Sequence, residues 1–311
     1  MGSGELVLFL EAAVRLGIPL ALAAMGEAIA ERSGVINIGV EGSIIAGALG
    51  GALGGIWFGT AGPGVLVGAA AGASVAFVFA AFAIGLGTDQ IITGTAITLG
   101  GLGLTSAIYQ ARFGATGTAL TLPTLASSPV PGLSGIPWVG SALFAQAPTA
   151  YLAYGLAPVL WYFLFRTEWG LELRAVGEDP DAAAAAGVRV RWVRFWATVF
   201  GGALAGVAGA HLALAHAGTF AENMSAGRGF IAIAVVVLGR WNPVLVLLAA
   251  LLFGGASALQ FLLQALGWDL PYQLFLALPY LLTLAALAGW VGRARAPASL
   301  ALPWPRDESR S

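Results

Sequence analysis

The chain has 311 residues, of which 59% are hydrophobic and only 9% are charged, and its mean hydropathy is +0.87. Soluble domains carry about a quarter charged residues, so this composition excludes a soluble protein and indicates an integral membrane protein. The basic residues are all arginine and the net charge is −1, which suggests no nucleic-acid partner, and the absence of cysteine excludes disulfides and thiolate metal sites.

Apolar runs of about 20 residues recur from end to end, and each can cross a hydrocarbon core of about 30 Å as a helix. They do not alternate in polarity as barrel strands do, so we expect an all-α polytopic membrane protein with about nine transmembrane helices, in a range of eight to ten. The first run lacks the basic region and cleavage site of a signal peptide, and the seventh is short enough to be re-entrant. The predicted spans are residues 6–25, 36–58, 64–86, 91–111, 149–166, 194–216, 225–240, 243–266 and 271–291.

Arginine is concentrated in two segments, and short arginine-rich loops stay in the cytoplasm. We therefore place the loop 167–193 and the segment after Trp290 in the cytoplasm. The loop 112–148 has one arginine and no acidic residue, so it is predicted to lie outside, as is the N-terminus. The sequence thus predicts one transmembrane domain, residues 1–296, followed by a disordered cytoplasmic tail, residues 297–311.

Small residues recur at four-residue spacing in two of the predicted spans. At this spacing they let the backbones of membrane helices approach closely, so we interpret the two rows as packing surfaces. The rows are Gly47, Gly51 and Gly55 in one span, and Gly201, Ala205 and Gly209 in the other.

The stretch "ERSGVINIGVEG", residues 31–42, places polar residues between two apolar runs. Asn37 and Glu41 are four residues apart and would share one face of a helix. An ionisable group inside a membrane bundle usually faces a water-filled path or a partner group, so both are predicted to line a solute path. The alternative is an interfacial turn in which Glu31, Arg32 and Glu41 pair with one another.

The stretch "LRAVGEDPDAAAAAGVRVRWVR", residues 173–194, contains the signals of a short helix. Asp179 suits the N-cap, Pro180 the first helical position, Asp181 the positive end of the helix dipole, and Gly187 the position after the last turn. A helix of about two turns is unstable alone in water, so it must pack against something. We interpret it as a cytoplasmic handle for a partner, the alternative being a loop helix packed on its own bundle.

Two further polar stretches are "LGTDQIITGTAI", residues 86–97, and "GTFAENMSAGRGF", residues 218–230. Asp89 is predicted to cap the helix that follows it, and Gln90, Thr93 and Thr98 could line the inner face of that helix. Glu222 and Arg228 are nearly the only charges on the predicted outer side. They are candidates for docking an external partner, with interfacial anchoring as the alternative.

No catalytic or nucleotide-binding motif accompanies these stretches. A phosphate-binding loop needs a lysine, which the chain lacks, and no nucleophile triad or zinc motif occurs. His211 and His216 are five apart on one predicted helix, so they do not form a metal pair. We expect a protein that is not an enzyme and holds no cofactor or metal, with ATP, if used, bound by another chain.

Four stretches resemble, in this order, the membrane permease subunit of binding-protein-dependent ABC importers, in the simple-sugar and nucleoside branch. They are "GEAIAERSGVINIGVEGSIIAGA", "LGTDQIITGTAI", "LRAVGEDPDAAAAAGVRV" and "SAGRGFIAIAVVVLGRWNP", and the resemblance covers about residues 6–291. It implies a multi-pass protein of the bacterial inner membrane. It also implies three kinds of partner: an ABC ATPase that binds ATP and Mg, a second permease that we expect to be a paralogue, and an extracytoplasmic solute-binding protein.

The resemblance also suggests roles for the polar stretches. Residues Glu178 to Gly187 match the family's coupling helix, which docks in the ATPase, and the acidic Asp179 and Asp181 lead us to expect a basic groove there. A path of amides and hydroxyls suits a neutral polar solute, most of all a nucleoside. The predicted sites are Asn37, Glu41, Gln90, Thr93 and Asn223 for the solute path, Glu178, Asp179, Pro180, Asp181 and Gly187 for ATPase coupling, and Glu222 and Arg228 for receptor docking.

Other solutes and another class of transporter stay open at this point. Riboflavin or a simple sugar would suit the same path. An ATP-independent secondary carrier would instead use Glu41 and Asp89 as ion or proton sites, but it would have no use for a capped cytoplasmic helix.

Overall fold

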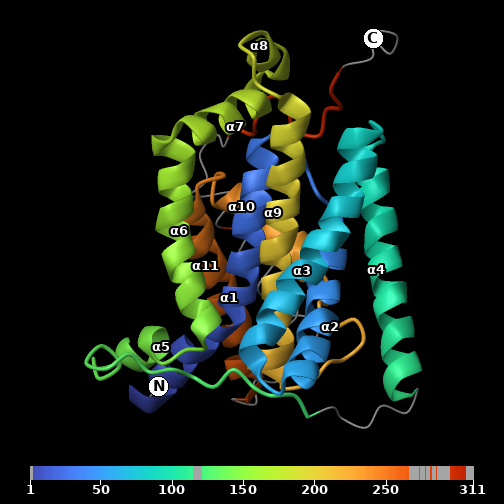
Figure 1. Ribbon diagram of the computed structural model, residues 1–311. Coiled ribbons are helices and arrows are strands. Elements are labelled where there is room, and N and C mark those ends of the chain that lie inside the picture. Colours follow the sequence, from blue (N-terminus) through green and yellow to red (C-terminus); the bar gives the residue numbers. More distant parts are fainter. Residues whose placement is uncertain are drawn as a thin grey trace.

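The computed structural model describes residues 3–114, 121–265 and 295–305, together with positions 273, 277, 281 and 285. These residues form helices and connections, with no strand among them (Figure 1). The elements in chain order are α1 (Ser3–Arg32), α2 (Val40–Phe58), α3 (Ala61–Ala80), the π-helical η1 (Ala81–Gly85), α4 (Gln90–Phe113), α5 (Gly140–Phe144), α6 (Pro148–Arg166), α7 (Glu168–Glu178), α8 (Pro180–Ala185), α9 (Val190–His211), the π-helical η2 (Leu212–Ala217), α10 (Arg228–Leu238) and α11 (Pro243–Ala265).

Six helices in the described residues are long and apolar enough to cross a membrane: α1, α2, α3 with η1, α4, α9 with η2, and α11. This confirms the all-helical membrane fold. The predicted count of about nine spans is not confirmed. Residues 149–166 and 225–240 do form helices, α6 and α10, that are not among the six, and the predicted span 271–291 lies outside the described residues apart from its single positions.

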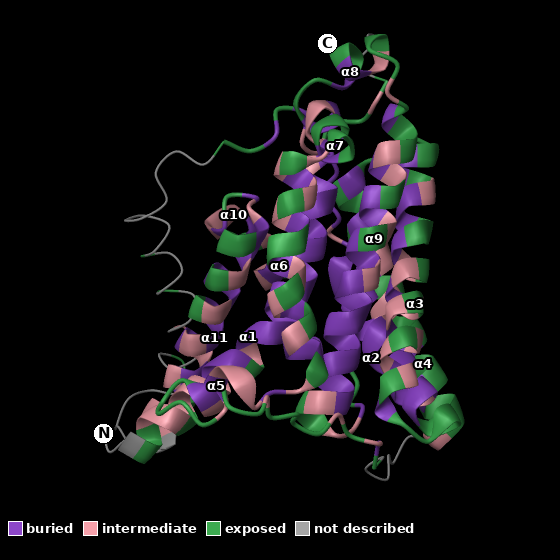
Figure 2. Cartoon of the chain, turned by 60° about the vertical axis from the view of Figure 1, so that its left-hand side comes forward, coloured by how far each residue is buried: buried purple, intermediate pink, exposed green. Residues whose placement is uncertain are grey.

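The long helices run side by side, with α7 and α8 at one end of the bundle and α5 at the other (Figure 1). Helices α1, α2 and α9 are rich in buried residues, while α3 and α6 expose much of their surface (Figure 2). Helix α4 packs on α2 and is mostly exposed. The predicted cytoplasmic loop 167–193 and residues 121–148 of the predicted external loop therefore lie at opposite ends. Which side of the membrane each end faces stays a prediction.

The two rows of small residues lie at close helix crossings, most of them where α9 meets α2 and, at Gly201, where α9 meets α1. A Cβ atom added to Gly47 would collide with the backbone of Gly206, and one added to Gly209 would collide with the carbonyl of Ile44. Backbones this close gain dispersion contacts that side chains would prevent, which is how helices associate when lipid supplies no hydrophobic drive. The predicted packing surfaces are confirmed.

Two connections interrupt the helical pattern inside the bundle. Residues 33–39 separate α1 from α2, and residues 218–227 precede α10. With 11 residues, α10 is about 16 Å long, about half of the hydrocarbon thickness. The short seventh segment is therefore a half-length helix joined to an irregular segment. Irregular backbone inside a membrane-spanning bundle is tolerated only where the protein itself supplies hydrogen bonds.

The segment 295–305 is packed, in contrast to the predicted disordered tail from residue 297. Ser299 is fully buried, and its backbone N–H donates to the carbonyl of Gly177 at 2.9 Å. Trp304 packs against the small apolar cluster formed by Val176, Ala183 and Val190. Residues 297–305 are thus part of the folded domain, and residues 306–311 of the predicted tail lie outside the described residues.

Candidate functional site

Helix α8 forms the tip of the bundle beyond α7, and its ends match the sequence signals (Figure 1). The Asp179 carboxylate accepts the backbone N–H groups of Asp181 at 3.1 Å and Ala182 at 3.0 Å, so Asp179 is the N-cap, and Pro180 follows at the first position. Gly187 adopts a positive φ of 91°, a left-handed conformation in which a side chain would be strained. The short capped helix is therefore confirmed.

One face of α8 is anchored and the other is open. Ala183 is buried in a small apolar cluster with Val176 and Val190, whereas Ala182 and Ala185 are exposed. This arrangement combines the two sequence interpretations, because α8 packs on its own bundle and still presents a smooth surface of small side chains outward. A partner groove could approach that surface closely.

The acidic residues around α8 are engaged within the chain. Asp179 caps the helix, Asp181 accepts the indole N–H of Trp304 at 2.7 Å, and Glu178 accepts the backbone N–H of Ala298 at 3.3 Å. These donors are neutral N–H groups, so the carboxylates keep their negative charge, and the expected basic groove in a partner stays a prediction.

The connection 33–39 is held by polar side chains of the neighbouring helices. The Glu27 carboxylate accepts the backbone N–H of Asn37 at 2.8 Å, and the Gln90 side-chain oxygen accepts that of Ile36 at 2.9 Å. The Thr98 hydroxyl donates to the carbonyl of Ile38 at 3.1 Å. These bonds replace the helical ones that the irregular backbone lacks. Gln90 and Thr98 are both buried and serve the backbone here.

Glu41 joins two helix N-termini. It lies in the first turn of α2, is 2% exposed, and accepts the backbone N–H groups of Gly227 at 2.8 Å and Gly229 at 2.6 Å. These donors belong to the start of α10, whose partial positive charge favours a carboxylate. Glu41 thus satisfies the unpaired end of the half-length helix from a segment far away in the sequence.

The predicted pairing of Asn37 with Glu41 on one helical face is wrong, because α2 begins only at Val40 and Asn37 lies in the irregular connection before it. The alternative, an interfacial turn in which Glu31, Arg32 and Glu41 pair with one another, is also wrong. Glu31 accepts the indole N–H of Trp241, and Arg32 donates to the carbonyl of Trp241 at 3.1 Å, so these two residues meet at Trp241 and not at Glu41.

The five predicted path residues do not gather around one cavity in the described part of the chain. Asn37, Glu41 and Gln90 are buried, while Asn223 is exposed in a turn where its φ is 57°. Thr93 faces an open recess between η1 and α4 and shares a 2.7 Å hydrogen bond with Thr88. Asp89 at the rim of this recess caps α4, as predicted, by accepting the N–H groups of Ile91 and Ile92.

Of the two predicted receptor-docking residues, Glu222 is exposed and accepts a hydrogen bond from the Gln110 amide at 2.9 Å, which connects the segment 218–227 to α4. Arg228 is half-buried at the start of α10, and its guanidinium donates to the carbonyls of Met224 at 3.0 Å and Ser225 at 3.1 Å. The two side chains therefore stabilise their own segment, and their predicted contact with a receptor stays a prediction.

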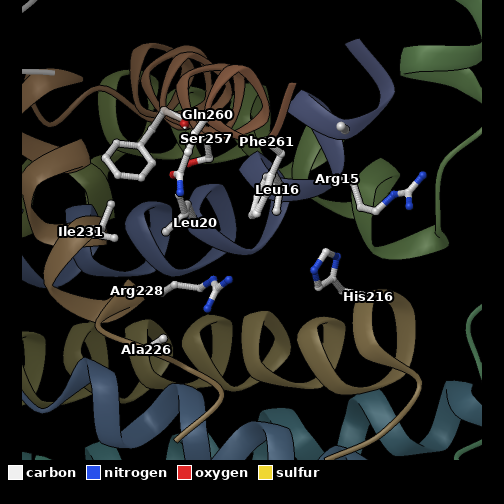
Figure 3. A pocket seen from close by; sticks show the side chains of 12 residues that line it. Arg15, Leu16, Leu20, His216, Ala226, Arg228, Ile231, Ser257, Gln260 and Phe261 are labelled. Atoms are coloured by element: carbon white, nitrogen blue, oxygen red, sulfur yellow. Dashed lines mark hydrogen bonds between the residues drawn. The ribbon is translucent and has the colours of Figure 1, made fainter. Parts of the chain in front are cut away.

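A cavity of about 490 Å³ lies between α1, η2, α10 and α11. Arg15, His216 and Arg228 surround its open centre, and Ser257 and Gln260 of α11 line another side (Figure 3). This size is within the range of small-molecule sites. Sequence reasoning missed this cavity because its residues come from four separate segments and share no motif.

Comparison with known proteins finds a family and several relatives that match most of the chain. The chain matches, over residues 9–287, a family described as the permease component of a branched-chain amino acid transport system. It is 42% identical over 265 residues to a putative glucose ABC transporter permease protein, TsgC13, of Haloferax volcanii, with 83% of this chain and 78% of the relative covered. It is 38% identical over 295 residues to the guanosine ABC transporter permease protein NupQ of Bacillus subtilis, with 92% of each chain covered.

A third relative is the nucleoside ABC transporter permease protein NupC of Lactococcus lactis, 34% identical over 292 residues that cover 90% of each chain. No solved structure matches the chain. The relatives confirm the resemblance seen in the sequence, and they are transport subunits, not enzymes. Since the family model and these alignments span most of the sequence, the chain belongs to this family of multi-pass membrane permeases of ABC transporters.

Proposed function

We propose that the chain is one permease subunit of an ATP-driven importer of nucleosides. The observation that carries this proposal is the alignment with the guanosine and nucleoside permeases, which covers nine-tenths or more of both chains in each pair. A simple sugar is the second candidate, because the putative glucose permease has the higher identity of 42%. Both solutes are neutral and polar.

The second permease of the importer is proposed to be a paralogue of this chain. Bacillus subtilis has a second guanosine ABC transporter permease protein, NupP, that is 31% identical to this chain, compared with 38% for NupQ. Lactococcus lactis likewise has NupB at 28% beside NupC at 34%. In each organism the chain resembles one permease more than the other, which supports a pair of different subunits. An ABC ATPase and an extracytoplasmic solute-binding protein complete the proposed complex.

Helix α8 is proposed as the element that the ATPase moves. Its position at the tip, its exposed small face and its fixed ends support this role, as does the match of Glu178 to Gly187 with the family's coupling helix. Movement of α8 would tilt the bundle and expose the path alternately to the two sides. Because α2, α3 and α9 touch through small residues, their crossings can serve as sliding surfaces.

The capping of α8 can be tested by substitution. Asp179→Ala removes the cap, which costs about 1 kcal/mol, so we expect ATP-dependent uptake to fall by roughly fivefold, since about 1.4 kcal/mol corresponds to tenfold. Asp179→Ser keeps a capping oxygen and is expected to retain most of the uptake. Equal losses in both variants would show that the carboxylate itself, and not the cap, is needed.

The proposed function is tested by reconstitution. The chain is co-expressed with an ABC ATPase and a paralogous permease from the same organism and incorporated into proteoliposomes. Uptake of labelled guanosine and glucose is then measured with the solute-binding protein and with ATP or a non-hydrolysable analogue. We expect ATP-dependent guanosine uptake that glucose does not inhibit. Uptake of glucose alone would establish the second candidate, and uptake by this chain without ATP or partners would establish a secondary carrier.

A further inference from the structure

The packed segment 295–305, here called the C-terminal strap, contacts the proposed coupling element at several points. The hydroxyl of Ser299 donates to the carbonyl of Gly177 at 2.7 Å, at the end of α7. Its neighbour Ala298 donates to the Glu178 carboxylate, and Trp304 donates to Asp181 on α8 itself. Residues toward both ends of the strap are thus bonded to α7 and α8, the part of the chain that is proposed to move.

The strap also contacts the connection between α1 and α2. The backbone N–H of Ala301 donates to the carbonyl of Gly34 at 3.1 Å. Gly34 has a positive φ of 91° and lies so close to Ser299 and Arg194 that a side chain there would collide with both. The strap therefore lies between two segments that are more than 140 residues apart in the sequence, the one carrying α8 and the one leading to α2.

Arg194, at the start of α9, joins these parts. Its guanidinium donates to the carbonyl of Ser33 at 3.1 Å, to that of Leu302 at 2.9 Å and to the hydroxyl of Ser299 at 3.0 Å. The side chain is 3% exposed. Burying a guanidinium is costly unless its donors are satisfied, and the planar fork of five N–H groups suits several fixed acceptors at once. Lysine could not reproduce this geometry.

The contacts continue from Ser33 toward the middle of the bundle. The connection 33–39 is bonded to Glu27 and Gln90, and Glu41, in the first turn of the helix that follows it, caps α10. Hydrogen bonds therefore join α8 to the strap and join the strap and Arg194 to the connection 33–39, and the backbone of that connection leads on to the place where the two helix N-termini meet.

We propose that the C-terminal strap, positioned by Arg194, transmits displacement of α8 to the connection 33–39, and that it sets how tightly ATP hydrolysis is coupled to transport. This inference rests on the proposed function, in which α8 is the element that the ATPase moves. A tail that only anchored the fold would not need to bond to the exposed tip, whereas the Trp304 indole reaches Asp181 there.

The test uses the complete importer in proteoliposomes and compares solute transported per ATP hydrolysed. Trp304→Phe keeps an aromatic ring against Val176 and Ala183 but removes the indole N–H. Asp181→Leu removes the acceptor of the same bond, and Arg194→Lys keeps the charge but not the fork. We expect Trp304→Phe and Arg194→Lys to hydrolyse ATP within twofold of the unmodified complex and to transport at least threefold less solute per ATP. Asp181 lies on the proposed docking helix, so for Asp181→Leu only the solute transported per ATP is compared, with the same expected fall.

The double variant Trp304→Phe/Asp181→Leu separates transmission from other roles of the two residues. Since both changes break one bond, we expect it to lose no more coupling than the more affected single variant. Additive losses would overturn the proposal, as would unchanged coupling in all variants. A joint fall of melting temperature, ATPase activity and transport would also overturn it, because it would show that the strap is only an anchor.

A second readout does not depend on the solute. Amide hydrogen exchange of residues 33–39 is measured in the purified complex, and we expect faster exchange in Trp304→Phe than in the unmodified chain, with the exchange of α11 unchanged. If the unmodified complex takes up neither nucleoside nor sugar, the proposed function fails. The exchange result still shows whether the strap and the connection 33–39 are coupled.

Discussion

Replacing Glu41 by alanine is expected to abolish uptake and to lower the yield of folded protein sharply. The substitution leaves the N–H groups of half-buried Gly227 and buried Gly229 without their acceptor, and each unsatisfied group shielded from water costs about 1–3 kcal/mol. The total of about 2–6 kcal/mol is a large part of the 5–15 kcal/mol that stabilises a typical fold. The start of α10 would then separate from α2.

Glutamine at position 41 provides a graded comparison. Its side-chain oxygen can accept one of the two N–H groups, but its NH2 group would face the other donor, so we expect an intermediate loss of uptake and melting temperature. Glu172→Ala removes an exposed carboxylate from α7 and serves as the control, with an expected change of under 0.5 kcal/mol. Full activity of Glu41→Ala would show that the junction of α2 and α10 is held by other contacts.

Gly209→Ala is expected to destabilise the protein by about 3 kcal/mol or more, at the upper end of the cost of overpacking. The added methyl group would collide with the backbone carbonyl of Ile44 and the N–H of Ala48. A backbone cannot rotate away as a side chain can, so α2 and α9 would have to move apart. The measurement is the melting temperature of the purified chain in detergent, followed by uptake.

The control for this substitution is Gly103→Ala on α4. A Cβ atom there would meet no atom within 4 Å, and alanine is about 1 kcal/mol better than glycine inside a helix. We expect the melting temperature of this variant to stay the same or rise slightly. If both substitutions behaved alike, close packing of α2 on α9 would not be what stabilises the bundle.

Local features of the fold were predictable from the sequence. The ends of α8 follow from Asp179, Pro180 and Gly187, which lie within nine residues of one another and act on the backbone next to them. The cap at Asp89 and the small-residue faces of α2 and α9 are predictable for the same reason. Each of these signals is either local or a simple helical period.

The long-range contacts were not predictable. The role of Glu41 depends on donors 186 and 188 residues further along the chain, and no spacing rule connects such positions. The strap was missed because proline and polar residues near the end of a chain are typical of disorder, whereas the burial of Ser299 depends on α7 and α9. The prediction that Asn37 and Glu41 share one helical face was wrong because it applied a helical period across the start of α2 at Val40.

The distance in sequence between Glu41 and Gly227 has a consequence for biosynthesis. Ribosomes add about 5–20 residues per second, so the 186 residues between these two positions take about 10 to 40 s to synthesise. For that time Glu41 lacks the two N–H groups that later hold it. A carboxylate in this position must stay hydrated or protected by the insertion machinery until α10 arrives, which makes pairing of Glu41 a late step in assembly of the subunit.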